Sequence, residues 1–161
     1  MTAVSEATIF YLKKLTGQCF EQIDGVPDED VNNWRPALGL EDVNTFFALL
    51  THLIASGEFW VLSVAAEQPT HRVRSTEFIA TGDVAALRAS AAAWLAGCET
   101  MLAALNPADF ERVVHYNAIV TGTPSTDTIA NCLVHAVGHT ANHLGHLQIL
   151  RQIWNAERGA R

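Results

Sequence analysis

The sequence predicts an all-α protein, a four-helix bundle, and three observations lead to this prediction. Four long segments carry apolar residues at the spacing of an amphipathic helix. Proline or glycine stands where each of the first three segments stops. The chain has 161 residues, of which 49% are hydrophobic, so it can bury one core. We therefore expect a single domain over residues 1–161, because amphipathic helices joined by moderate loops bury their apolar faces in a bundle.

The boundaries of the four predicted helices follow from capping residues and helix breakers. The helices are expected to span roughly residues 5–22, 41–68, 83–105 and 125–156. Their expected N-terminal residues are Ser5, then Glu41 or Asp42, then Asp83, and finally Ser125 or Thr126. Apolar residues at helical spacing include Leu12 and Cys19 in the first helix, Phe46, Leu50 and Leu53 in the second, Leu87, Trp94 and Cys98 in the third, and Ile129, Cys132 and Leu147 in the fourth.

The segments between the predicted helices carry turn signals. Residues 26–40 are expected to form a loop that Trp34 and Pro36 pack against the bundle. Residues 70–82 are expected to form a second loop. Residues 110–124 are predicted to be irregular; their VVHYNAIV stretch is compatible with an extended chain, but we predict no sheet there.

Charge and cysteine content exclude several classes of protein. The formal net charge is -7, and the ten lysines and arginines are scattered, so we expect no nucleic-acid partner and no anionic membrane surface. No uncharged apolar run approaches the roughly 18 residues of a membrane helix. The three cysteines, Cys19, Cys98 and Cys132, form no framework spacing, which indicates reduced thiols in a cytoplasmic protein. The N-terminal residues lack the pattern of a signal peptide.

Histidines are concentrated in one stretch of the fourth predicted helix, VHAVGHTANHLGHLQ. On a helical wheel, His143 falls within the apolar stripe and His139 lies at its edge. His135 and His146 lie further round, toward the flank of the helix. At least two imidazoles are therefore expected to point into the bundle.

The spacing of His139 and His143 is typical of a metal site. Side chains four residues apart on a helix lie one turn apart on the same side, so their two imidazoles can bind one ion. Further ligands must come from a facing helix, and His52 is the only other histidine within a predicted helix. His52 lies off the main apolar stripe but shares a side with Ala48 and Phe59, which could be a second buried face. Spacing alone leaves open a structural ladder of imidazoles without metal.

These stretches resemble a known family. The sequence HAVGHTANHLGH resembles the fourth-helix signature of the DinB-like (DinB/YfiT) superfamily, whose members tend to read H-x-x-x-H-x-x-x-H-R-G-Q. THLIASGEFWVL resembles its second helix, where one histidine opens the metal site, and FIATGDVAALRASAAAWL resembles the entry to its third helix. The resemblance covers nearly the whole chain in the same order. It implies an up-down-down-up bundle that holds one divalent ion through His52, His139 and His143. Leu144 replaces the usual arginine and His146 the usual glutamine, so we expect the groups that orient the ligands to differ.

Three neutral histidines leave at least one open coordination position, which is typical of a catalytic metal site. Zinc or nickel suits such a site best, and iron or manganese would also fit. The open position could hold a nucleophilic water or a substrate thiolate. Residues 140–142, between the two ligands, offer no carboxylate as general base. The lack of a general base favours a thiolate over a water molecule at the open position. The resemblance is consistent with a thiolate, because the superfamily includes transferases and isomerases that use low-molecular-weight thiols, beside members described as metal-dependent hydrolases. We expect a thiol-dependent S-transferase acting on small electrophiles in detoxification or stress response.

Other functions stay open at this point. A hydrolase of small esters or amides could use His135 or His146 as its acid–base group, because an imidazole titrates near neutral pH. A non-enzymatic metal-binding stress protein is a further alternative. His71 and His115 are expected to be structural, and Cys132 a buried apolar residue. The expected partners are a small-molecule substrate and a second copy of the chain, because many members of the superfamily are described as dimers. An exposed apolar residue such as Trp154 could serve that interface.

Overall fold

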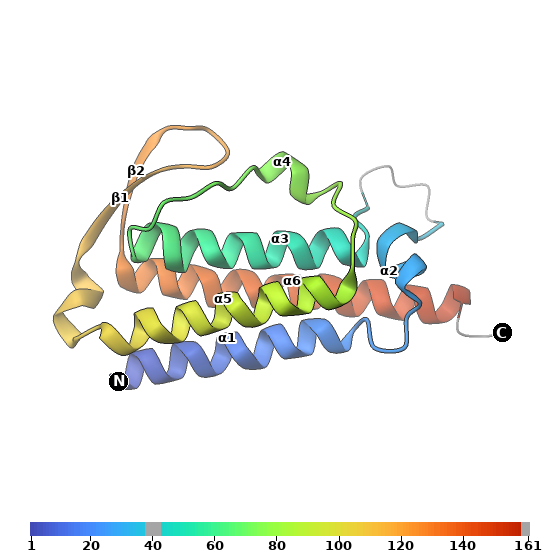
Figure 1. The fold of residues 1–161 in the computed structure, drawn as a ribbon, viewed down its shortest axis with the longest axis horizontal. Helices are drawn as coiled ribbons and strands as arrows, with labels where there is room; N and C mark the ends of the chain where they lie inside the picture. Colours follow the sequence, from blue (N-terminus) through green and yellow to red (C-terminus); the bar gives the residue numbers. More distant parts are fainter. Residues whose placement is uncertain (38–42, 159–161) are drawn as a thin grey trace.

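Four long helices dominate the structure, a computed structural model that describes residues 1–37 and 43–158. They are α1 (Ala3–Glu21), α3 (Phe46–Glu58) with its continuation η1 (Phe59–Ala65), α5 (Val84–Ala104) and α6 (Ile129–Arg158). The shorter elements are α2 (Asp28–Asn33), α4 (Arg74–Glu77), η2 (Pro107–Glu111) and the strands β1 (Val113–Asn117) and β2 (Pro124–Thr128). Helices α1 and α6 run in one direction and α3 and α5 in the other (Figure 1). The predicted up-down-down-up four-helix bundle is therefore confirmed.

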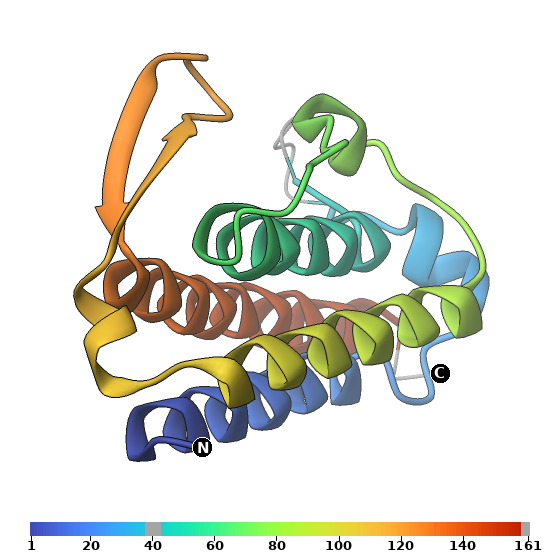
Figure 2. The ribbon, with the colours of Figure 1, turned by 60° about the vertical axis from the view of Figure 1, so that its left-hand side comes forward.

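One apolar core lies between the four helices. Helix α1 packs against α5 and α6, and α3 packs against the same two helices from the other side (Figure 2). The fully buried side chains that meet there include Leu12, Leu53, Trp94, Leu102 and Leu147. Ten of the thirteen residues of α3 are buried, because the segment that carries α4 runs over its outer face. The second buried face expected for the predicted second helix therefore exists.

The segment Phe46–Ala65 is long and apolar enough to cross a membrane by composition alone. In the bundle, 67% of its most apolar window is buried against other elements. The apolar composition of this segment is therefore explained by its position in the core of the bundle.

The helix starts follow capping chemistry, with one shift from the prediction. Helix α1 begins earlier than expected: the Thr2 hydroxyl accepts from the backbone N–H of Ser5, so Ser5 is not the cap. Asp83 caps α5 as predicted. Helix α3 begins at Phe46 with Thr45 as its cap, and residues 43–45 are not helical. The expected start at residues 41–42 lies outside the described residues.

The three predicted irregular segments contain more regular structure than expected. Within residues 26–40, α2 forms one short helix, and Trp34 is packed down as predicted. Within residues 70–82, α4 forms a single turn. The largest correction is a β-hairpin, in which β1 pairs antiparallel with β2 from Val113–Thr128 to Asn117–Pro124. A β-hairpin forms because two segments pair with each other. The periodicity of residues within either segment does not reveal that pairing.

The hairpin also moves the start of α6. Ser125 and Thr126 belong to β2, so neither caps the helix as predicted. Helix α6 begins at Ile129, and the Thr128 hydroxyl accepts from the backbone N–H of Asn131. Val114 on β1 is fully buried, which anchors the hairpin beside η1 and α6.

The second predicted helix changes character after Glu58. Phe59–Ala65 is a π-helix, and the backbone then takes a positive φ of 55° at Glu67, so the helix ends before Pro69. Such wider turns are frequent at functional sites, because they rotate side chains away from the regular helical positions. Here the π-helix carries Phe59 and Trp60, which border the histidine cluster.

Candidate metal centre

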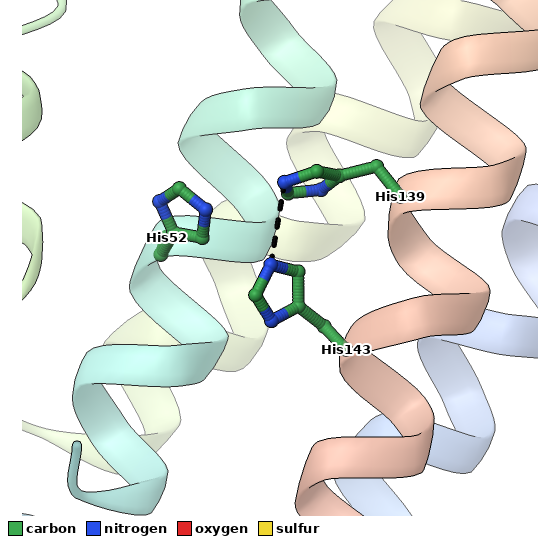
Figure 3. Close-up of side chains that lie close together, drawn as sticks. All are labelled: His52, His139 and His143. Atoms are coloured by element: carbon green, nitrogen blue, oxygen red, sulfur yellow. Dashed lines mark hydrogen bonds between the residues drawn. The ribbon is translucent and has the colours of Figure 1, made fainter. Parts of the chain in front are cut away.

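Three histidines from two helices converge in the bundle. His52 comes from α3, and His139 and His143 come from consecutive turns of α6 (Figure 3). One ring nitrogen of each residue lies within 4.8 Å of the others. A hydrogen bond of 3.3 Å joins the Nε2 atoms of His139 and His143. The structure thus brings together the three residues that the family resemblance named.

Packing of α3 against α6 fixes this geometry. On α6, the buried side chains of Ala136 and Thr140 face the bundle on the same side as His143. The Thr140 hydroxyl donates to the carbonyl oxygen of Ala136, so this buried hydroxyl is paired within its own helix. His52 is 5% exposed and His143 is 9% exposed, so bulk water has little access to either ring.

Burial keeps the three imidazoles neutral. It is the main cause that lowers the pKa of His139 to about 3 and the pKa of His143 to about 4. The neighbouring imidazoles lower both values further, because two positive charges at this distance repel one another. Burial also lowers the pKa of His52, although Glu77 acts in the opposite direction. At neutral pH each ring therefore offers a nitrogen lone pair, which is the form that binds a metal ion.

A buried carboxylate orients His52. The Nδ1 atom of His52 lies 2.6 Å from Oε2 of Glu77, whose side chain is 4% exposed. Because the carboxylate accepts the Nδ1–H, the Nε2 lone pair of His52 is left free to face the other two rings. Arg72 donates to both oxygens of Glu77, at 2.7 and 3.0 Å, and so compensates the buried charge.

Sequence reasoning missed both Glu77 and Arg72. They lie in the segment expected to be a loop, where an acid and a base five residues apart give no periodic signal. Two other helical carboxylates, Glu58 and Glu99, do not contribute to the cluster. Glu99 pairs with Lys13 on the surface, and Glu58 is exposed and lines a different hollow from the one beside the cluster.

A cleft opens beside the cluster. It has a volume of about 310 Å³, in the range of small-molecule sites. Its walls come from α3, η1, the 72–74 segment, the hairpin turn and α6. The polar and aromatic lining residues include His52, Trp60, Arg72, Arg74, Tyr116, His135 and His139. Two of the three clustered histidines thus border a space that a small molecule can enter.

Comparison with known proteins agrees with this geometry. The sequence model of the DinB superfamily matches residues 14–147, which include the whole cluster. The chain belongs to the DinB superfamily. A crystal structure described as a conserved protein of locus from Enterococcus faecalis has the same fold as this DinB protein, with a TM-score of 0.69. The two sequences are 13% identical, and the superposition covers 95% of this chain and 98% of that one. No curated protein matches the sequence.

In this member of the DinB superfamily, His135 and His146 flank the cluster. Both are exposed, although their wheel positions placed them on the flank of the helix and not on its solvent face. The ring centroid of His135 lies 5.8 Å from that of His139 and 4.2 Å from that of Trp60, inside the cleft. The Nδ1 atom of His146 lies 3.4 Å from Nδ1 of His143, on the opposite side of the cluster from His135. His146 can therefore orient the ring of His143.

The remaining sequence candidates lie away from the DinB cluster. His71 and His115 are exposed, and neither belongs to the three-histidine group. Cys132 is fully buried, and burial raises the pKa of its thiol to about 11, so it is the apolar core residue expected from the sequence. Leu144, at the position of the usual arginine, packs in the core at 8% exposure.

Proposed function

We propose that this protein binds one divalent metal ion, zinc or nickel foremost, through His52, His139 and His143. We further propose that it catalyses transfer of a low-molecular-weight thiol to a small electrophile. The observation that carries this proposal is the convergence of three neutral imidazoles within 4.8 Å at the wall of a cleft. Three nitrogen donors with a free position are typical of catalytic zinc sites.

The donor set fits a metal ion better than a ladder of packed histidines. The Nε2 atoms of His139 and His143 face each other at 3.3 Å on neutral rings, close enough for one ion to bind both in place of the hydrogen bond between them. His52 presents its Nε2 in the same direction because Glu77 accepts from its Nδ1. This carboxylate–histidine arrangement is the usual support of metal-binding histidines. A bound ion would lower the pKa of a thiol or a water molecule at its open position.

The lining of the cleft favours a thiol over water as the nucleophile. A hydrolase needs a general base next to the water, and the described residues that line this cleft include no aspartate or glutamate. Glu77 is already engaged by His52 and Arg72. In the proposed reaction, the thiol sulfur bonds to the electrophilic carbon, and the bond to the leaving group breaks with its electron pair. The thiol proton goes to solvent.

Hydrolysis of small esters or amides is the second candidate, and one observation supports it. His135 lies in the cleft beside His139, and burial lowers its pKa, so its ring is neutral at pH 7 and can accept a proton. Replacing His135 with glutamine separates the two candidates. The variant should lose ester hydrolysis while it keeps thiol transfer, for which His135 is dispensable.

The first test is the metal content of protein purified without chelator or affinity-tag metal. We expect about one ion per chain in the wild type and in the control His115→Ala, and most of it lost in His143→Ala. A wild type that takes up no zinc, nickel or manganese would overturn the proposal and leave the histidines as a structural ladder. The loaded protein is then assayed with L-cysteine and 1-chloro-2,4-dinitrobenzene, and with 4-nitrophenyl acetate. Metal binding with neither reaction would indicate the non-enzymatic alternative.

The proposal includes a small-molecule substrate, a cytoplasmic setting and a homodimer. The three cysteines are free and buried, which suits a reducing compartment. Trp154 does not supply the exposed interface expected from the sequence, because it is half-buried and its Nε1 donates to Asp30 at 2.9 Å. Large exposed apolar side chains lie instead on α1 and α6, among them Tyr11 and Val134. Sedimentation of wild type and Val134→Glu tests this, with a dimer expected only for the wild type.

A further inference from the structure

Arg74 differs from the other arginines of the described chain in the contacts of its guanidinium group. Five arginines donate hydrogen bonds to carboxylate or carbonyl oxygens, namely Arg35, Arg72, Arg88, Arg112 and Arg151; a sixth, Arg158, forms an ion pair with Asp30 at 3.8 Å. Among the described residues, no hydrogen bond or ion pair is found for the guanidinium of Arg74. Arg74 is exposed and is one of the residues that line the cleft beside the histidine cluster.

Aromatic contact holds Arg74 near the cluster. Its guanidinium carbon lies 4.7 Å from the centre of the Phe78 ring, and that ring lies 4.8 Å from the ring of His52. The positive charge of Arg74 is near enough to help lower the pKa of His52. The side chain is therefore positioned at the cleft without being neutralised there.

The cleft around Arg74 carries an uncompensated positive charge. Arg72 is the only other arginine in its lining, and Glu77 neutralises it. No carboxylate lines this cleft within the described parts of the chain. The opposite wall is apolar and aromatic, with Trp60 and Tyr116 in edge-on contact at 5.3 Å and Ile119 in the hairpin turn. Such a space fits a molecule with one apolar end and one anionic end.

We propose that Arg74 binds the carboxylate of a small organic acid in this cleft, with the acid's apolar part against Trp60 and Tyr116. A guanidinium binds a carboxylate through two parallel N–H···O bonds, which are stronger than neutral hydrogen bonds. The inference rests on the proposed function in that it names the chemistry of a substrate of the same site. The carboxylate can belong to the thiol or to the electrophile, and both would present the same group to Arg74.

The test compares acids with neutral amides of the same shape. Isothermal titration of the metal-free and the zinc-loaded protein uses two probe pairs: 3-mercaptopropanoate with its amide, and benzoate with benzamide. Metal-free protein is included because a carboxylate can also bind zinc directly. We expect at least one acid to bind about tenfold more tightly than its amide, and this preference to vanish in Arg74→Gln. Arg74→Lys should keep part of it, because it retains charge without the planar fork.

The control is Arg88→Gln, which removes an arginine that pairs with Asp24 away from the cleft and should keep the full preference. A preference limited to the mercapto acid assigns the carboxylate to the thiol, and a preference for benzoate assigns it to the electrophile; either supports the proposal. Equal binding of acid and amide, absence of binding at millimolar concentrations, or a preference that persists in Arg74→Gln overturns it. Metal content is measured on the same samples, so loss of the metal site is distinguished from loss of anion recognition.

Discussion

The carboxylate of Glu77 accepts the Nδ1–H of His52 across 2.6 Å, and both side chains are buried. This contact decides which nitrogen of His52 faces His139 and His143, because the acceptor fixes the tautomer of the ring. It also explains why a charged side chain is buried in the segment that covers α3. Glu77 is stabilised by Arg72 on one side and by His52 on the other.

Replacing Glu77 with glutamine should weaken metal binding by about 10- to 100-fold, because the amide no longer favours the Nδ1–H tautomer of His52 as strongly. The measurement is zinc affinity by competition with a chromogenic chelator. Glu99→Gln is the matched control, since Glu99 pairs with Lys13 on the surface, away from the cluster. Equal zinc affinities in the two variants would show that Glu77 has a purely structural role.

The depressed pKa values of the histidines predict an acid-labile metal-free protein. In the unfolded chain these rings titrate near their ordinary value of 6.5, whereas in the fold His139 and His143 titrate at about 3 and about 4. Between these limits the unfolded state binds more protons, so the free energy of unfolding falls as the pH falls through about 6.5 and below. Each histidine contributes up to about 1.4 kcal/mol per pH unit in that window.

Urea unfolding with chelator between about pH 7 and pH 5 measures this dependence. In His143→Gln the slope should be shallower, because one titrating group is gone and the charge that repels His139 is removed with it. His115→Gln, which changes an exposed histidine, should leave the slope unchanged. A wild-type free energy of unfolding that is flat over this range would contradict the prediction.

The sequence predicted the elements whose signal lies within one segment. The spacing of Leu12, Trp94 and Leu147 marks helix faces, because a buried helix face repeats every three or four residues. The same periodicity placed His139 and His143 on adjacent turns. Periodicity offered His52 as a candidate but did not place it inside the bundle, because its buried face exists only where the segment around α4 covers α3; the family resemblance named it as a ligand.

The missed elements depend on contacts between distant segments. Glu77 is buried because it meets His52, twenty-five residues away in sequence, and nothing in the residues around it indicates that partner. The hairpin forms because residues 113–117 and 124–128 pair with one another. Arg74 could not be identified as a site residue from the sequence either. It differs from the other arginines in having no hydrogen bond or ion pair within the described chain, and only the structure shows which arginines have such partners.

His146 should support the site less strongly than Glu77 does. Its Nδ1 lies 3.4 Å from Nδ1 of His143, a longer and more exposed contact than the one between Glu77 and His52. His146→Ala should therefore lower zinc affinity by at most about tenfold. His146→Gln, which restores the usual residue of the DinB signature, should bind zinc as the wild type does. A greater loss in His146→Gln than in His146→Ala would argue against an orienting role.

The close approach of α3 and α5 at Gly57 makes a prediction about stability. A Cβ atom at Gly57 would lie 2.1 Å from Cζ2 of Trp94, a fully buried side chain of the core. Gly57→Ala should therefore destabilise the protein by about 1–3 kcal/mol, the usual result of adding a group to a filled core.

Gly138→Ala is the control: Gly138 lies in α6 with nothing within 4 Å of the added Cβ. This second change should stabilise the protein by about 0.4–1 kcal/mol, because alanine favours the helix. Urea unfolding of the two variants should shift in opposite directions, and a Gly57→Ala variant as stable as the wild type would show that α3 and α5 can separate at this point.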